Sequence, residues 1–483
     1  MRQSKPMTPG VNKRLLFDEA SVEAKEGFTT VMNPALRTEA PVLTPEEPWE
    51  RHGCCAPTVM LDSGVYKMWY CAYGEDDVAR SCYAVSTDGI HWQRPNLGLI
   101  DYAGSRDNNI VISFHGGVFQ HHGSIFKDPA DKPERRFKCI YGGGLYAYES
   151  IYGGGARFRY DAVLPATWHY SGIAGAYSPD GIHWTPYEEL IMPWYTDTVN
   201  VAFWDDRIQK YVAYVRWNEY LRVEAGALKG SFDYRAIARS ESQDFENFPL
   251  PEKILEPDFN HPEDADMWGG GLYDTAAVKY PFAADAYLIF TAAYHHTNDT
   301  LDVELATSSD GVHFTRWREP FVRLGPAGDF DSMMIYMGVG MLPIGDEIWL
   351  YYGGFDQPHD QVTEGKYRPA IGRVRVRLDG FVSQDAGGQG GWLTTRPFVL
   401  EGDHLEVNLD GSSRGWLKVE ILDETMQPLQ GFTEQEADRL VGNDVRSVAT
   451  WGGKRDLSAI RGKPVRLRFV GSSVKLYAFQ LAS

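Results

Sequence analysis

The sequence is poor in cysteine and in positive charge, and each shortage excludes a class of function. Five cysteines occur in 483 residues, and none forms a C-x-x-C pair, so we expect buried reduced thiols rather than disulfides or a metal ribbon. Asp and Glu number 66 against 47 Lys and Arg, which gives a formal net charge of -19 at pH 7. A chain this acidic has no basic surface to spare for phosphates, so we expect neither nucleic acid nor a membrane as partner.

Long apolar runs, helical periodicity and nucleotide-binding motifs are also absent. No apolar run approaches the ~20 residues that a membrane-spanning helix needs. Residues 1–14 are polar and lack the apolar core of a signal peptide, which leads us to expect a cytoplasmic protein. The sequence has no G-x-S-x-G elbow, no P-loop and no dinucleotide fingerprint. Serine-hydrolase and nucleotide-dependent chemistry are therefore not expected.

A repeated heptad is the strongest positive feature of the sequence. Residues 86–92, 178–184 and 308–314 share the pattern Ser-x-Asp-Gly-x-His-aromatic, and weaker copies lie at 240–245 and 377–381. The aspartates of successive copies are 92, 64, 66 and 69 residues apart. This spacing is typical of a four-stranded propeller blade with long loops. Each copy is interpreted as a hairpin staple, with Gly at positive φ and the aromatic wedged between blades.

The segments between the copies contain short aromatic and β-branched runs bounded by turn residues, which predict strands. We therefore predict an all-β fold: a five-bladed β-propeller over residues 31–395, an N-terminal extension over 1–30, and a C-terminal β-sandwich over 396–483. The 92-residue interval holds a Gly- and Tyr-rich insertion, 142–170, interpreted either as a lid over a pocket or as a surface loop.

The five tags, together with strands such as "GVYKMWY", "IQKYVAYVRW" and "DEIWLYYGGFDQPHD", resemble the five-bladed propeller glycosidases, the group that contains glycoside hydrolase families 32, 43, 117 and 130. The resemblance covers roughly residues 30–395, and the C-terminal strands resemble the sandwich of family 32 enzymes. It implies an exo-acting glycosidase on an oligosaccharide or glycoside, a furanoside such as a fructoside or arabinoside being one option.

Two alternatives remain open. The segment "YYGGFD" is similar to family 130 and suggests a phosphorylase or transferase, which would need an anion pocket of convergent Arg or His. A non-catalytic carbohydrate-binding propeller is the other. No cofactor is required for any of these, an axial Ca²⁺ or Na⁺ is left open, and so is oligomerisation.

The innermost strands of a propeller converge on its axis, so polar residues that lead those strands are site candidates. Glycoside cleavage needs one group that protonates the leaving oxygen and a second carboxylate. The catalytic candidates are Asp197, Asp331, Asp274, Glu50 and His122. The candidates for substrate binding are His52, His121, Arg216, Arg239, Glu241, Trp268, His295 and His359.

The sequence departs from families 32 and 43, which carry Asp, Asp and Glu on the first three blades. Cys54 or Cys55, His122 and Asp197 stand near those places. Either Glu50 replaces the first Asp or the chemistry has moved around the ring, and family 117 offers a precedent for a histidine acid. No zinc site is expected, because adjacent histidines do not share a face as H-x-x-x-H does on a helix.

Overall fold

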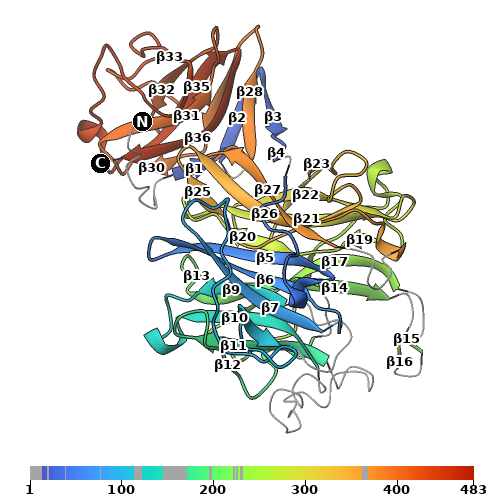
Figure 1. The fold of residues 1–483 in the computed structure, drawn as a ribbon. Coiled ribbons are helices and arrows are strands. Elements are labelled where there is room, and N and C mark those ends of the chain that lie inside the picture. The colour runs from blue at the N-terminus through green and yellow to red at the C-terminus, as the bar shows by residue number, and fades with distance from the viewer. Residues whose placement is uncertain are drawn as a thin grey trace.

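The computed structural model of the chain is built almost entirely of β-strands, arranged as a propeller and a sandwich (Figure 1). The fold predicted from the sequence is confirmed. No helix among the described residues is long and apolar enough to cross a membrane. The structure describes residues 13–18, 21–38, 40–76, 78–113, 122–144, 171–194, 198–220, 223–224, 227–228, 232–361 and 368–482.

The five blades follow one another along the chain, each an antiparallel meander. Their inner strands contact one another around the axis, and Thr58 of the first blade bridges Val339 of the fifth. The first blade is β5 (Gly53–Asp62), β6 (Val65–Tyr73), β7 (Ala79–Ser86) and β8 (Ile110–Ser113); the second is β9 (His122–Lys127), β10 (Phe137–Gly144), β11 (Ser171–Ser178) and β12 (Thr185–Pro186).

The remaining blades are joined in one continuous network of strands. The third is β13 (Val201–Asp205), β14 (Lys210–Tyr220), β17 (Phe232–Ser242) and β18 (Glu252–Leu255), with the small hairpin β15 (Val223–Glu224) and β16 (Ala227–Leu228) between β14 and β17. The fourth is β19 (Gly271–Leu272), β20 (Ala276–Lys279), β21 (Tyr287–His295), β22 (Thr300–Ser308) and β23 (Thr315–Val322). The fifth is β24 (Met334–Met337), β25 (Leu342–Ile344), β26 (Glu347–Phe355) and β27 (Ala370–Arg377), completed by β4 (Leu36–Arg37) from the N-terminal part of the chain.

The three full tags and the weaker copy at 240–245 lie between the third and fourth strands of their blades, whereas the fifth follows β27 and leads into β28 (Val382–Ala386) of the sandwich. The full tags form the predicted staple. In the first copy Ser86 Oγ accepts the Gly89 N–H at 2.9 Å, Asp88 Oδ1 accepts the His91 N–H at 2.8 Å, and Gly89 has φ +73°. The Gly89 carbonyl accepts a hydrogen bond of 2.7 Å from the hydroxyl of Tyr351 on the fifth blade. Trp92 packs edge-on against the Tyr351 ring at 5.8 Å. The tags therefore lock neighbouring blades together.

The sandwich includes the N-terminal strands, which the sequence analysis assigned to an extension. In Figure 1 the blue strands β2 and β3 stand among orange and red strands of the C-terminal region. One sheet joins β1 (Lys13–Leu15), β3 (Phe28–Met32), β28 (Val382–Ala386), β36 (Val474–Ala482), β31 (His404–Asp410) and β34 (Asn443–Val448). The other joins β2 (Val22–Glu26), β29 (Gly391–Thr395), β35 (Pro464–Ser472), β32 (Trp416–Leu422), β33 (Leu440–Val441) and β30 (Phe398–Val399).

The domain boundaries expected at 30/31 and 395/396 are thus corrected. Strands β28 and β29, placed in the propeller by the sequence analysis, pair with sandwich strands instead. The physical reason is that strand periodicity shows how a strand faces its core but not which sheet it joins, and these partners lie about 80 to more than 350 residues away in sequence.

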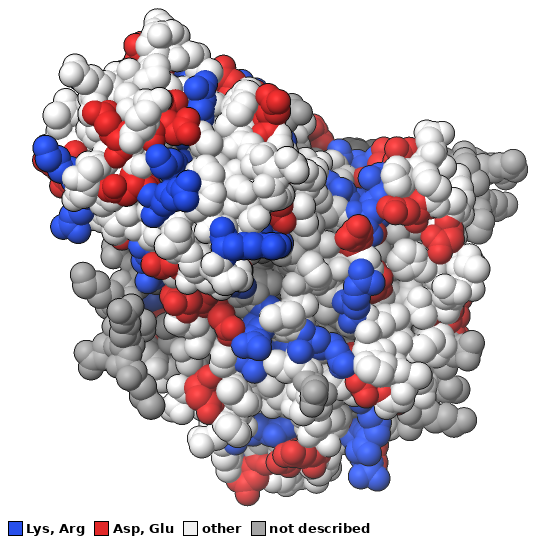
Figure 2. Space-filling model, turned by 90° about the horizontal axis from the view of Figure 1, so that it is seen from above, with Lys and Arg blue, Asp and Glu red and all other residues white. Residues whose placement is uncertain are grey.

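The sandwich docks against the fourth and fifth blades. Met32 and Ala478 of the sandwich share one apolar core with Phe321 of the propeller. The buried Lys13 forms an ion pair of 2.6 Å with Asp379, the aspartate of the fifth tag. On the face shown in Figure 2, acidic and basic side chains are intermixed rather than gathered into one continuous basic surface.

Candidate functional site

The clearest functional candidate is Asp274, which stands between β19 and β20 at the start of the inner strand of the fourth blade. Its side chain is fully buried. Oδ1 accepts hydrogen bonds from the Thr198 hydroxyl at 2.7 Å and the Val199 N–H at 3.1 Å. No described group donates a hydrogen bond to Oδ2. Burial raises the pKa of Asp274 to about 6, although the charge of Arg216 opposes the shift.

A cationic and aromatic cluster adjoins this carboxyl. The guanidinium groups of Arg216 on β14 and Arg235 on β17 both lie over the ring of Tyr273, at 4.4 and 4.3 Å from its centroid. The Tyr273 hydroxyl is 2.9 Å from His359 Nε2, and burial lowers the pKa of that histidine. Side chains from the third, fourth and fifth blades therefore form one cluster with Asp274. Of this cluster, Asp274, Arg216 and His359 were predicted from the sequence.

One group of described residues has the composition of a cation site. One ligand atom each from Asp299, His359 and Asp360 lies within 4.8 Å of the others. Asp299 already accepts hydrogen bonds from the Tyr294 hydroxyl at 2.7 Å and the Asp360 N–H at 2.9 Å, which leaves each of its oxygens further lone pairs. The axial Ca²⁺ or Na⁺ left open by the sequence stays a prediction.

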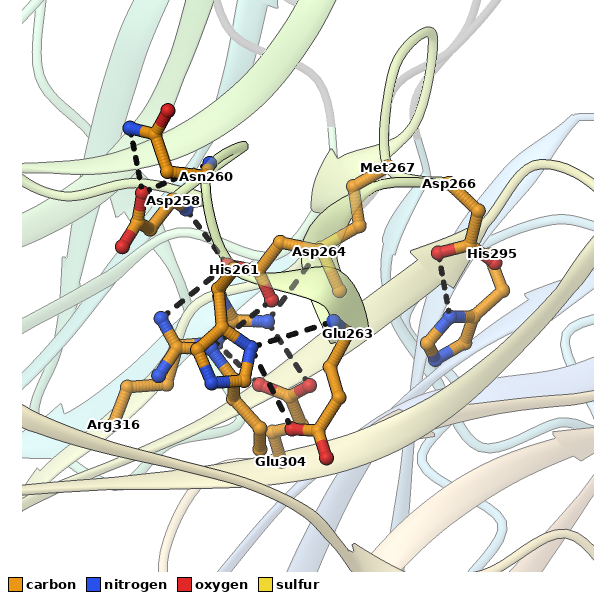
Figure 3. Close-up of polar contacts among 11 residues, drawn as sticks. Asp258, Asn260, His261, Glu263, Asp264, Asp266, Met267, His295, Glu304 and Arg316 are labelled. Carbon is orange, nitrogen blue, oxygen red and sulfur yellow. Dashed lines mark hydrogen bonds and ion pairs between the residues drawn. The ribbon is translucent and has the colours of Figure 1, made fainter.

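Two further candidates lie on or beside the loop that leads into β19. This loop contains the 3₁₀ turn η3 (Pro262–Asp264). His295 at the end of β21 lies 3.6 Å from Asp302 and 3.4 Å from Asp266, and these carboxylates raise its pKa to about 9. Figure 3 shows its contact with Asp266. Trp268 is exposed on the same loop.

Two predicted catalytic carboxylates, Glu50 and Asp331, are hydrogen-bonded to neighbouring Arg and Tyr side chains. Glu50 is fully buried and accepts hydrogen bonds from the Tyr70 hydroxyl at 2.5 Å and from Arg94 at 2.8 and 3.0 Å. Asp331 is likewise buried and bound by Arg37 and by the Tyr352 hydroxyl. Both oxygens of each carboxyl accept hydrogen bonds, which ties Glu50 and Asp331 to neighbouring segments of the fold.

Arg239 and Glu241 form an ion pair with each other, and Lys210 joins it at 2.8 Å. Since β14 and β17 are antiparallel, the register places Arg239 opposite Tyr214 and Arg235 opposite Asn218. Arg239 and Glu241 therefore lie toward the end of the blade that carries the tags.

The remaining predicted residues are only partly covered by the structure. Asp197, His121 and the lid candidate beyond Gly144 to residue 170 lie outside the described residues. His122 begins β9, the inner strand of the second blade, and its side chain is not among those described. His52 is half-buried, and its N–H donates to the Tyr73 carbonyl at 2.8 Å. None of the five cysteines, all of which the structure describes, forms a disulfide, and all five are buried.

The sequence analysis missed Arg235, Tyr273 and Thr198. Tyr273 precedes Asp274 and could have been included by extending each inner-strand motif by one residue. Arg235 lies on a third strand, so only the strand register and its contact with Tyr273 identify it.

Comparisons with known proteins return structures alone. No protein-family model and no curated protein sequence matches the chain. A putative glycoside hydrolase from Bacteroides ovatus is 14% identical, covers 71% of this chain and 97% of its own, and superposes with a TM-score of 0.44. An N-acetylgalactosamine deacetylase from F. plautii bound to the blood group B trisaccharide is 13% identical, with coverages of 73% and 96% and a TM-score of 0.45.

A third similar structure comes from the GH130 family, described as mannoside phosphorylases that contain glycoside hydrolases targeting β-1,2 mannosidic linkages in Candida mannan. It is 15% identical, with coverages of 72% and 94% and a TM-score of 0.43. At these identities and TM-scores the similarities assign neither a family nor an activity to this chain.

Proposed function

We propose that the protein is a glycoside hydrolase in which Asp274 is the general acid. The observation that carries the proposal is a fully buried carboxyl with a pKa near 6 and an oxygen, Oδ2, to which no described group donates. A carboxyl in this state keeps its proton to a higher pH than an exposed aspartate and can pass it to the leaving glycosidic oxygen.

The neighbouring groups supply the other parts of the reaction. Hydrolysis needs a second carboxylate, which acts either as nucleophile or as the base that activates water. We assign this role to Asp197, the residue before Thr198 in the sequence, whose successor is hydrogen-bonded to Asp274. Arg216 offers N–H donors for sugar hydroxyls, and the Tyr273 hydroxyl, which donates its own proton to His359 Nε2, offers oxygen lone pairs.

The burial of Asp274 favours an exo-acting enzyme. A fully shielded acid is reached more easily by the terminal sugar of a chain than by an internal unit, and entry requires a shift of the groups packed over it. Furanosides such as fructosides and arabinosides are the first substrates to test, because the sequence resembles families that include furanosidases.

A second candidate is phosphorolysis. Arg216 and Arg235 converge on Tyr273, and their guanidinium groups can bind a phosphate that attacks in place of water. Activity that requires inorganic phosphate and releases a sugar phosphate would select this alternative.

The deciding experiment is a screen of the purified chain against furanosides, pyranosides and oligosaccharides, with and without phosphate. Asp274→Asn and Asp197→Asn should abolish turnover while the proteins stay folded. Asp331→Asn is the matched control: it should lower stability and leave the kcat of the folded protein near that of the parent. Binding without any turnover would favour the non-catalytic carbohydrate-binding propeller.

A further inference from the structure

Trp268 exposes a large apolar side chain to solvent. Its side chain is 49% exposed, and it is the only Phe, Tyr or Trp classed as exposed among the described residues. Large aromatic side chains dominate the energetics of binding sites.

The indole forms a platform with two other rings. Trp268 stacks on Phe259, with ring centroids 4.2 Å apart and planes at 17°. The ring of Tyr234 meets Phe259 and Trp268 edge-on at 5.0 and 6.0 Å. Phe259 therefore covers one face of the indole, and we call this group the Trp268 platform. A platform with one face already supported needs little reorganisation to bind a flat apolar surface.

The loop that carries Trp268 is anchored by buried side chains. Asp264 of η3 is fully buried, accepts the Asp258 N–H at 2.7 Å and pairs with Arg316 at 2.6 Å (Figure 3). Met267, the residue before Trp268, is also fully buried. These contacts fix the position of Trp268 before any ligand arrives.

The platform is also tied to the candidate site. Arg235 Nη1 donates to the carbonyl of Gly269, the residue after Trp268, at 2.9 Å, and the same guanidinium lies over Tyr273. Tyr273 in turn precedes Asp274. Arg235 thus connects the loop that carries Trp268 with Tyr273, the residue next to Asp274.

Polar groups flank the rings. Glu256 accepts hydrogen bonds from the Tyr234 hydroxyl at 2.8 Å and from Lys253 at 2.5 Å. A carboxylate and an ammonium group beside an aromatic face are the partners that sugar hydroxyls need, since the ring C–H face stacks and the hydroxyls at its edge form hydrogen bonds.

From these contacts we propose that the Trp268 platform is a subsite for a second sugar ring, on the leaving-group side of Asp274. The inference rests on the proposed glycosidase function and names its substrate class: an oligosaccharide of two or more units rather than a glycoside with a small leaving group. One stacking contact of this kind accounts for a gain in affinity of about 10-fold.

The test measures binding as a function of chain length. The full-length Asp274→Asn protein is titrated by calorimetry with fructo-, arabino- and manno-oligosaccharides of one to four units. We expect about a 10-fold gain in affinity from one unit to two or three in one of these series. Adding Trp268→Ala should remove that gain, whereas Leu250→Ala, which truncates an exposed side chain away from the platform, should keep it. An unchanged gain in the Trp268→Ala protein, or no gain with length in any series, overturns the subsite.

Turnover of the parent protein, measured separately, distinguishes the two ideas. Length-dependent binding that needs Trp268 but comes without turnover refutes hydrolysis and leaves the subsite standing. Turnover of an oligosaccharide with a kcat/KM indifferent to Trp268→Ala refutes the subsite and leaves hydrolysis standing.

Discussion

Arg37 and Asp331 lie 294 residues apart in the sequence, and Arg37 Nη1 donates to both carboxylate oxygens of Asp331, at 2.9 and 3.1 Å. Arg37 belongs to β4, the strand that completes the fifth blade, whereas Asp331 precedes the inner strand of the same blade. The contact therefore fastens the N-terminal strand to the last blade and helps to close the propeller.

Arg37→Ala should destabilise the protein by about 3 kcal/mol or more, because it leaves the fully buried Asp331 without its cation. The free energy of unfolding in urea measures the effect. Arg375→Ala, which breaks an exposed ion pair with Glu347 on the same blade, is the control and should cost less than about 1 kcal/mol. Equal losses for the two variants would contradict the closing role of Arg37.

The hydrogen bonds that neighbouring blades donate to the tags should each be measurable. Tyr351→Phe and Tyr214→Phe remove only the hydroxyls that donate to the Gly89 and Gly311 carbonyls at 2.7 Å. Each change should lower the free energy of unfolding by about 1–2 kcal/mol, because a buried carbonyl loses its partner. Thermal unfolding of the single and double variants tests this; since the two sites involve different blades, their effects should add.

Asp274 should cost stability at neutral pH. Its folded pKa of about 6 exceeds the value of an unfolded aspartate, so the folded state binds more protons, and the free energy of unfolding falls as pH rises from about 4 to 6. Asp274→Asn lacks this titration. The variant should gain roughly 1–3 kcal/mol relative to the parent above pH 6 and lose that advantage below pH 4. Urea unfolding at pH 4, 5, 6 and 7 provides the measurement, and a difference independent of pH would be evidence against the raised pKa.

His295 should add stability through its charged form, whereas the charged form of Asp274 costs stability, although for both groups the free energy of unfolding falls as pH rises. Its pKa is raised to about 9 by Asp302 and Asp266, so its charged form stabilises the fold fully below about pH 6.5, and that stability is lost as pH rises through about 9. The melting temperature of His295→Gln, compared with the parent between pH 6 and 10, should differ most at the acidic end and converge at the alkaline end. His404→Gln, a change in the sandwich, is the control.

If Asp274 donates the proton, kcat/KM should decline as pH rises through about 6. Arg216 lowers the pKa of Asp274, so Arg216→Gln should move this decline to higher pH. Arg239→Gln removes a guanidinium from the same blade that pairs with Glu241, and should leave the profile in place. If Arg216→Gln leaves the pH profile unchanged, the observed ionisation is not that of Asp274.

Several local features could be predicted from the sequence because short-range chemistry dictates them. A Ser-x-Asp-Gly turn makes the same hydrogen bonds wherever it occurs, so the three full tags, with glycine φ values of +73°, +82° and +78°, were identifiable in advance. The number and spacing of the tags indicated five blades. The search for polar residues at the start of inner strands selected Asp274, but it selected Glu50 and Asp331 equally. Strand periodicity does not reveal which carboxylate contacts an arginine.

The sequence by itself determined the all-β class, the five tags and the list of polar residues that lead inner strands, since these follow from strand periodicity and turn chemistry over a few residues. The tertiary structure alone decided that Arg37 and Arg94 engage Asp331 and Glu50 while Asp274 keeps an oxygen without a described donor. It also decided that β1, β2 and β3 belong to the sandwich. Both outcomes depend on contacts between segments far apart in the chain, where burial and pairing, rather than local propensity, set the free energy.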